Sequence, residues 1–238
     1  MKILSLCSSL LLSFSITLSY SQDYTQVNAV EFAEKIKSKK ATLLDVRTSG
    51  EFKNGHITDA GQLNFYSLDF RKKLLLLPKD QPVYLYCNTG FRSRIAAEIL
   101  VKNGYSEVYN LEHGIMDWNL QDLPVVIEPD AQADNRDKME PDEYYALIQS
   151  DKPVFIDFYA PWCGPCRQMM PMIDSLKVSY KEDIKVVKIN ADASKRLVKE
   201  LGILGVPYFK MFNKGELIYS HTGLLPKPKV MGWFNSVL

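Results

Sequence analysis

The chain has 238 residues, of which 46% are hydrophobic and 24% are charged, a composition typical of a soluble protein that buries a core. This length allows one large domain or two small ones. Its 29 basic and 28 acidic residues nearly cancel, and no run of Lys or Arg stands out. The charge pattern therefore gives no sign of a nucleic-acid partner.

The first 21 residues are a candidate export signal. Lys2 precedes an apolar, serine-rich stretch from Ile3 to Leu18, and small residues flank a larger one in Ser19-Tyr20-Ser21. This pattern predicts a secretory signal peptide over residues 1–21, cleaved near Ser21. An uncleaved anchor is the alternative, but the stretch is short for a membrane span and diluted by serines. We therefore expect an exported protein, located in the bacterial periplasm.

Strand and helix signals alternate through residues 24–127, which is typical of a parallel sheet covered by helices. Asn28 can cap a first helix, because Glu31 follows three residues later. Buried strands are expected at residues 41–46, 82–86 and 108–111, and helices at 93–103 and 114–119.

Residues 128–138 are almost entirely polar, and we interpret them as a flexible interdomain linker. A second domain is expected over residues 139–238, beginning with a helix that has Pro141 in its first turn. Pro171 is expected to kink a later helix. Further strands are expected at 154–159, 184–189, 208–212 and 217–221, and further helices at 194–201 and 229–237.

The strongest chemical motif is Cys163-Gly164-Pro165-Cys166, which follows a predicted buried strand and opens a helix. The unpaired N–H groups and the dipole of a helix N-terminus favour a thiolate at Cys163. Cys166 lies one turn further and can close a disulfide with Cys163. Half of a zinc site is the alternative, but no second cysteine pair exists and the three histidines are scattered. We therefore favour a redox pair.

The segment from Phe155 to Cys166 (FIDFYAPWCGPC) resembles the thioredoxin family, and the resemblance extends over about residues 136–238. It implies a mixed sheet in which Cys163 is the attacking nucleophile and Cys166 the resolving thiol. It also implies that Asp157 is a buried acid that assists proton transfer at Cys166, with Lys188 as its partner.

The same resemblance implies a substrate-binding surface made by Trp162 and the Val206-Pro207 loop, whose peptide bond should be cis. The partners implied are disulfide-bonded protein clients and a membrane or soluble electron donor. Tyr208 stands where thioredoxins usually carry Thr, which leaves the choice of client open. The Gly-Pro insert resembles the reducing members, and an oxidant or isomerase is the alternative.

A third cysteine, Cys87, ends a predicted strand and is followed by Asn88, Thr89, Gly90, Phe91 and Arg92. Backbone N–H groups of such a loop, together with Arg92, can stabilise an anion at the sulfur. Tyrosine-phosphatase-like loops need a longer separation between Cys and Arg than the four residues found here. The tighter loop suits a persulfide. A buried inert thiol is the alternative, but the polar residues after Cys87 favour a reactive one.

Residues 24–127 resemble the rhodanese family in the segments Asp45-Val46-Arg47 and Gly55-His56-Ile57 as well as in this loop. The resemblance implies that Cys87 accepts sulfur from a sulfane-sulfur donor and passes it to a thiol or to cyanide, with residues 88–92 holding the substrate. It also implies that Asp45 and Arg47 brace the loop, whereas we interpret His56 as a structural hydrogen-bonding residue.

We therefore expect an α/β protein with two three-layer domains: a rhodanese-like parallel sheet over 24–127 and a thioredoxin-fold mixed sheet over 139–238. The expected function is thiol–disulfide exchange coupled to sulfur transfer through a persulfide on Cys87. The alternative is a reductase whose first half is a non-catalytic docking module. Neither a metal nor a cofactor is indicated.

Overall fold

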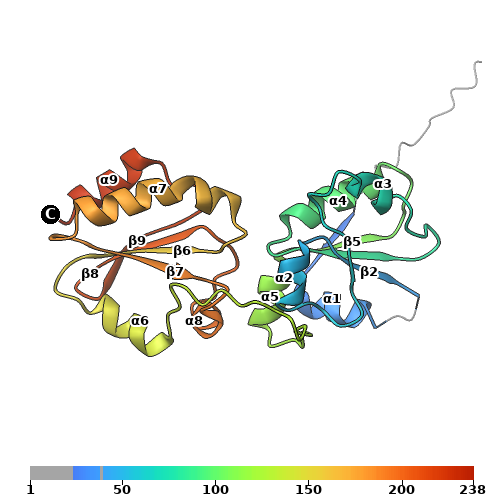
Figure 1. Cartoon of the computed structure of the whole chain (residues 1–238), viewed down its shortest axis with the longest axis horizontal. Helices are drawn as coiled ribbons and strands as arrows, with labels where there is room; N and C mark the ends of the chain where they lie inside the picture. Colours follow the sequence, from blue (N-terminus) through green and yellow to red (C-terminus); the bar gives the residue numbers. More distant parts are fainter. Residues whose placement is uncertain (1–23, 38–39) are drawn as a thin grey trace, which may run out of the picture.

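The computed structural model describes residues 24–37 and 40–238, which form two α/β units that follow each other along the chain (Figure 1). The signal peptide expected over residues 1–21 lies outside these described residues. Within them, no helix combines the length and the apolar character that a membrane span requires.

The first unit is built on a five-stranded sheet with the order β1-β5-β4-β2-β3, in which every strand pair is parallel. Asn28 caps the first helix as expected, because its Oδ1 accepts the Glu31 N–H at 3.0 Å. The strands are β1 (Thr25–Val27), β2 (Thr42–Asp45), β3 (Gly61–Gln62), β4 (Val83–Tyr86) and β5 (Val108–Leu111). The helices are α1 (Ala29–Lys35), α2 (Ser49–Lys53), α3 (Phe70–Leu74), α4 (Phe91–Val101) and α5 (Gly114–Leu120).

The second unit has a four-stranded mixed sheet with the order β7-β6-β8-β9, in which only the β6–β7 pair is parallel. The two sheets confirm the expected fold class. The strands are β6 (Val154–Tyr159), β7 (Lys185–Asn190), β8 (Tyr208–Asn213) and β9 (Glu216–Thr222). The helices are α6 (Pro141–Ile148), α7 (Gly164–Ser179, with Pro171 inside it), α8 (Lys195–Glu200) and α9 (Lys227–Asn235).

Each sheet is covered on both faces by helices, which gives each unit two apolar layers (Figure 1). In the first unit α3 and α4 pack on one face, whereas α1 and α5 pack on the other. In the second unit α7 and α9 cover one face, and α6 and α8 cover the other. Because side chains buried on both faces exclude water from the sheet, the carboxyl ends of its strands are where polar chemistry can reach the surface.

The two units also pack against each other. Met116 of α5 is buried in the apolar cluster of the second unit that includes Leu197 and Val198 of α8. Asp122, just after α5, forms an ion pair with Lys199 of α8. These contacts bring the loops that follow β2, β4, β6 and β7 to the same junction.

The linker expected over residues 128–138 makes hydrogen bonds to both units. Asn54 Nδ2 in the first unit donates to the Gln132 carbonyl at 3.1 Å. In the second unit, the Asn190 side chain donates to the Asp134 carbonyl at 3.1 Å, and the Asn190 N–H donates to the Asp137 carbonyl at 3.0 Å. The segment that the sequence predicts as a flexible connection is thus tied down at several points.

Candidate functional site

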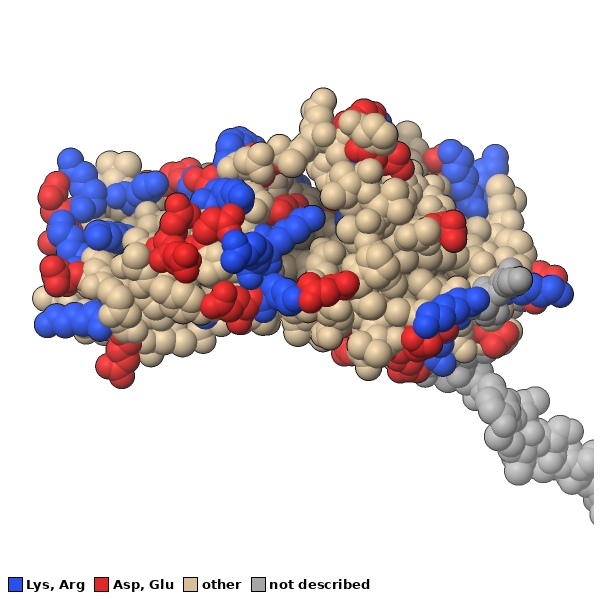
Figure 2. All heavy atoms as spheres, turned by 90° about the horizontal axis from the view of Figure 1, so that it is seen from below, with Lys and Arg blue, Asp and Glu red and all other residues tan. Residues whose placement is uncertain are grey.

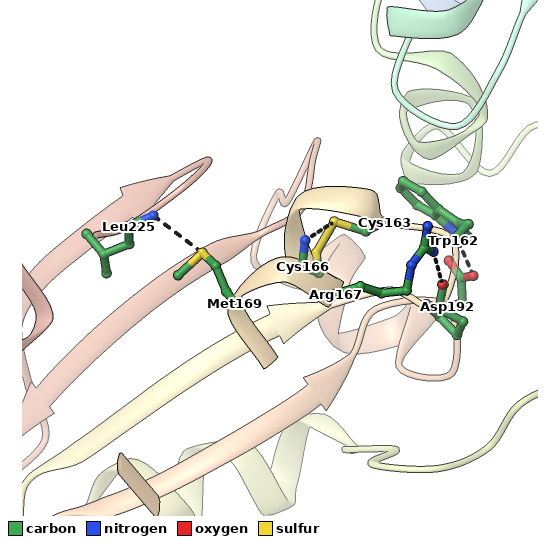
Figure 3. Close-up of a disulfide and its surroundings, with 8 residues drawn as sticks. Trp162, Cys163, Cys166, Arg167, Met169, Asp192 and Leu225 are labelled. Carbon is green, nitrogen blue, oxygen red and sulfur yellow. Dashed lines mark hydrogen bonds between the residues drawn. A yellow bond between two sulfur atoms is a disulfide. The ribbon is translucent and has the colours of Figure 1, made fainter. Parts of the chain in front are cut away.

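Cys163 and Cys166 are joined in a disulfide at the start of α7, with their Cα atoms 5.2 Å apart (Figure 3). Cys163 is the N-cap residue of α7, and its sulfur accepts the Cys166 N–H at 3.1 Å. Both cysteines are 2% exposed. The helix N-terminus therefore provides the electrostatic environment that favours a thiolate at Cys163 after reduction.

Trp162 and Val206 lie against the cysteine pair and pack with it in one apolar cluster. The Trp162 indole N–H donates to Asp192 Oδ2 at 2.8 Å, as Figure 3 shows. The surrounding protein atoms remove part of the water around the Asp192 carboxyl group, which raises its pKa. The Val206–Pro207 peptide bond is cis, as the family resemblance implies. The structure thus brings Trp162, Val206 and Pro207 to the cysteine pair.

Asp157 lies in the middle of β6 with 2% of its surface exposed, and its Oδ1 has no hydrogen-bond partner among the described residues. Burial raises the pKa of Asp157 to about 7, while the positive charge of Lys188 opposes the rise. The carboxyl group therefore exists in both protonation states near neutral pH, as a proton relay requires.

Lys188 does not pair directly with Asp157, although the two residues are register partners on β6 and β7. Its Nζ instead donates to Asp174 Oδ1 on α7 at 2.8 Å. Asp174 is about half exposed, so Lys188 can reach it without losing its hydration. Lys188 therefore acts on Asp157 through its charge and not through a direct ion pair.

Cys87 is a free thiol at the carboxyl end of β4 and is 1% exposed. The turn after it depends on Gly90, which has a φ of +81°, and a Cβ there would lie 1.8 Å from the Glu112 carbonyl oxygen. Helix α4 begins directly at Phe91, two residues before the predicted start. Thr89 is partly exposed and Phe91 is exposed, so both lie at the surface of the loop.

Asp45 and Arg47 stand behind this loop. Arg47 donates to both carboxylate oxygens of Asp45 at 2.7–3.0 Å, to the Gly55 carbonyl at 2.6 Å, and to Asn88 Oδ1 at 3.2 Å. His56 is buried and stacks on Phe52 with ring centroids 3.7 Å apart. The Arg47 contacts connect the loop to Asp45 and Gly55, and the ring of His56 contacts Phe52.

Glu51 is a site residue to which the sequence analysis assigned no role. Its carboxylate accepts from Arg92 at 2.6 and 3.2 Å and from Asn88 Nδ2 at 2.6 Å. Burial opposes ionisation of Glu51, but the hydrogen bonds and charge of Arg92 hold its pKa below the usual value. Glu51 also completes the capping box of α2 with Thr48, and this Thr-x-x-Glu spacing is the signal that could have drawn attention to it.

Arg92 is therefore a paired cation at the Cys87 loop, and its expected stabilisation of an anion at the sulfur stays a prediction. Its side chain is 9% exposed, that of Glu51 is 10% exposed, and the two form an ion pair. A buried Arg must find a counter-charge, and Glu51 is the carboxylate that reaches it.

A cleft of about 540 Å³ lies between the two units. Arg47, Glu51 and Asn88 line its first-unit side, and Pro161, Trp162 and Asp192 line its second-unit side. Figure 1 shows α5 facing α8 at the same junction. Because Asn88 follows Cys87 and Trp162 precedes Cys163, both cysteine loops border one space.

Among the described residues, no group of side chains is arranged to hold a metal ion.

The fold and the Cys163–Cys166 pair define a thiol–disulfide oxidoreductase joined to a rhodanese-like module. The thioredoxin family model matches residues 136–236, and the rhodanese-like domain model matches residues 28–121. The chain therefore belongs to the thioredoxin family, with a rhodanese-like domain preceding its thioredoxin domain.

Thioredoxins of several organisms are similar to the second unit. Thioredoxin of Porphyra purpurea is 39% identical over 92 residues, which cover 39% of this chain and 86% of the relative. Thioredoxin 1 of Nostoc sp. is 40% identical over 81 residues, covering 34% of this chain and 76% of the relative. The structure of oxidised mitochondrial thioredoxin 3 from Saccharomyces cerevisiae is 34% identical, with a TM-score of 0.36, covering 39% of this chain and 87% of that one.

Proposed function

We propose that the chain is a disulfide reductase whose Cys163–Cys166 dithiol also reduces a persulfide carried on Cys87. The observation that supports this most strongly is the cleft between the units, which is lined by Asn88 next to one cysteine and by Trp162 next to the other. A sulfur atom bound to Cys87 and the attacking thiol of Cys163 would then each lie next to a residue that lines the same cleft.

The Cys163–Cys166 dithiol supplies all the electrons that the proposed reaction needs in one turnover. The Cys163 thiolate attacks the outer sulfur of Cys87–S–SH, so that Cys163–S–SH forms and Cys87 leaves as a thiolate. The Cys166 thiolate then attacks Cys163 Sγ, closes the disulfide and releases hydrosulfide. The two electrons of the dithiol have reduced one sulfane sulfur to sulfide, and an external thiol reductant must reduce the disulfide again.

Asp157 would supply the proton transfer in the second step. The Cys166 thiol must lose its proton before it attacks, and burial has raised the pKa of Asp157 to about 7. An ionised Asp157 can accept that proton near neutral pH. Its Oδ1 has no other hydrogen-bond partner among the described residues, so an acceptor oxygen remains available.

Mass spectrometry of the full chain tests the coupling. Cys87 is loaded with sulfane sulfur while Cys163–Cys166 is oxidised, the dithiol is then reduced selectively, and loss of the extra sulfur is followed. Wild type should lose it faster than the Cys163→Ser variant and release sulfide, whereas Cys87→Ser should never carry it. Equal rates of loss in wild type and Cys163→Ser would remove the coupling from the proposal.

A second candidate function is that the first unit docks clients for the redox unit without catalysis. The 1% exposure of Cys87 and the neutralised charge of Arg92 favour it. Incubation with thiosulfate or with a polysulfide distinguishes the two candidates, since a docking module with a normal fold would acquire no sulfur on Cys87.

We also propose that the chain is exported to the periplasm, because residues 1–21 have the pattern of a signal peptide. Three cysteines would remain in the mature chain, and all three belong to the two proposed sites. N-terminal sequencing of the protein recovered from a bacterial periplasmic fraction should begin near Gln22. Recovery of intact Met1 in the cytosol would contradict this proposal.

A further inference from the structure

The charged side chains that line the cleft balance each other. Three are basic (Arg47, Lys138 and Lys195) and three are acidic (Glu51, Asp134 and Asp192). Figure 2 shows acidic and basic side chains interspersed over the junction of the two units. A pocket that selects anions by charge would carry an excess of Lys and Arg, and this cleft has none.

The two arginines nearest Cys87 are already paired. Arg47 donates to both oxygens of Asp45, and Arg92 is held by Glu51. All four side chains are at most 10% exposed, so water screens these charges little. A dianion that approaches Cys87 meets the Glu51 carboxylate as well as Arg92, and the two contributions oppose each other.

The remaining lining suits a small molecule with one charge of each sign. Lys195 makes no direct ion pair with the described residues, although its charge acts on the nearby Asp192, and it can receive a carboxylate. Asp192 provides negative charge for an ammonium group, while Asn54, Asn88 and Asn119 add amide hydrogen-bonding groups. The volume of about 540 Å³ lies in the usual range for small-molecule sites.

We propose that Cys87 receives its sulfur from a zwitterionic persulfide of the amino-acid class, and that Glu51 disfavours dianionic donors such as thiosulfate. The proposal rests on the proposed function, because it names the donor for the same cysteine. It makes Glu51 a specificity-determining residue, which acts through the position and charge of Arg92 and Asn88.

The transfer step needs no further reactant. The Cys87 thiolate attacks the outer sulfur of a donor R–S–SH, a new S–S bond forms at Cys87, and the S–S bond of the donor breaks. The products are Cys87–S–SH and the thiolate R–S⁻, so the proton stays on the transferred sulfur and no electrons leave the system.

Sulfur loading of Cys87 is measured by mass spectrometry on the full chain, with cysteine persulfide and thiosulfate as the two donors. In wild type, the rate at which thiosulfate loads Cys87 should stay constant or rise as salt is added. The reason is that the cleft has no net attraction for an anion that salt could screen. A rate that falls with salt, as at an anion-binding site, would overturn the proposal. This measurement needs no variant and is independent of the intrinsic reactivity of the two donors.

The variant Glu51→Gln should raise the rate with thiosulfate about tenfold and change the rate with cysteine persulfide less than about twofold, because one negative charge is lost next to Cys87. Glu98→Gln is the matched control, since Glu98 pairs with Arg94 on the same helix in a partly exposed ion pair. Equal changes with both donors would remove the role of Glu51. If neither donor loads wild-type Cys87, the proposed function itself fails. If thiosulfate loads Cys87 at a rate that falls as salt is added, only this inference fails.

Discussion

The ammonium group of Lys188 lies 2.8 Å from the Asp174 carboxylate and leaves the neighbouring Asp157 without a direct counter-charge. The charges of Lys188 and Asp174 therefore have opposite effects on the pKa of Asp157. Lys188 lowers the pKa of Asp157, and Asp174 raises it, while burial has the largest effect. The redox unit thus keeps a buried acid that is costly to ionise.

Replacing Asp157 with Asn should stabilise the oxidised protein at pH 8 more than at pH 4. The native state keeps Asp157 protonated up to pH of about 7, whereas the unfolded chain ionises it near pH 4. The native state therefore loses stability as the pH rises between these values, by roughly 4 kcal/mol in total. Denaturant unfolding of wild type and variant at both pH values measures the difference. An equal effect of the substitution at pH 4 and pH 8 would contradict the raised pKa.

Replacing Asp174 with Asn should lower the pKa of Asp157. The change removes a negative charge and frees Lys188 from its 2.8 Å contact, so that the ammonium can turn toward the buried carboxyl group. NMR titration of the Asp157 carboxyl carbon measures the pKa directly, and the pH profile of disulfide reduction should move in the same direction. Glu182→Gln, which removes an exposed acid beyond the end of α7, is the control and should leave the titration unchanged.

Replacing Gly90 with Ala should disrupt the Cys87 loop. The added Cβ would lie 1.8 Å from a backbone oxygen, so the loop must move, at a cost of roughly 3 kcal/mol or more. Gly104→Ala is the matched control, because φ at Gly104 is +84° but the nearest atom is the end of the Lys79 side chain at 3.7 Å. It should cost only about 1–2 kcal/mol of left-handed strain. Thermal unfolding and sulfur loading of Cys87 report both effects.

Replacing Met116 with Ala should loosen the contact between the two units. Met116 is 8% exposed and packs in the cluster that contains Val198, and truncation of such a buried Met costs about 2–5 kcal/mol. Hydrogen exchange of the linker amides at residues 131–137 and the radius of gyration in solution should both increase. Met231→Ala, at a partly buried residue of α9 that packs against the core of the second unit, should lower stability without changing either quantity. Unchanged exchange in Met116→Ala would show that the contact does not hold the units together.

The secondary structure around both cysteine sites could be predicted from the sequence because long apolar runs and helix-stop signals surround them. The strands expected at 108–111 and 154–159 have these bounds in the structure. By contrast β1, β3, α2 and α3 contain only two to five residues each, which is too few for a periodic pattern to emerge. Tertiary contacts decide such short elements.

The polar network of the site was less predictable. The sequence indicated that Arg92 lies near Cys87, but it could not show that Glu51, distant along the chain, neutralises it. Likewise Lys188 is opposite Asp157 in register, yet its side chain reaches Asp174. Long flexible side chains choose partners by three-dimensional distance and by the cost of leaving water. The cleft depends on the contact between the units, which no local pattern encodes.

Helix α5 has only seven residues, yet it belongs to both units. At its start, the N–H groups of Ile115 and Met116 donate to the carbonyls of Cys87 and Asn88 at 2.8 and 3.2 Å, while the Met116 side chain packs in the core of the second unit. A substitution in this helix therefore acts twice, once on the shape of the Cys87 loop and once on the packing of a neighbouring domain. Exchanging either half for a homologue should require α5 to be redesigned with it.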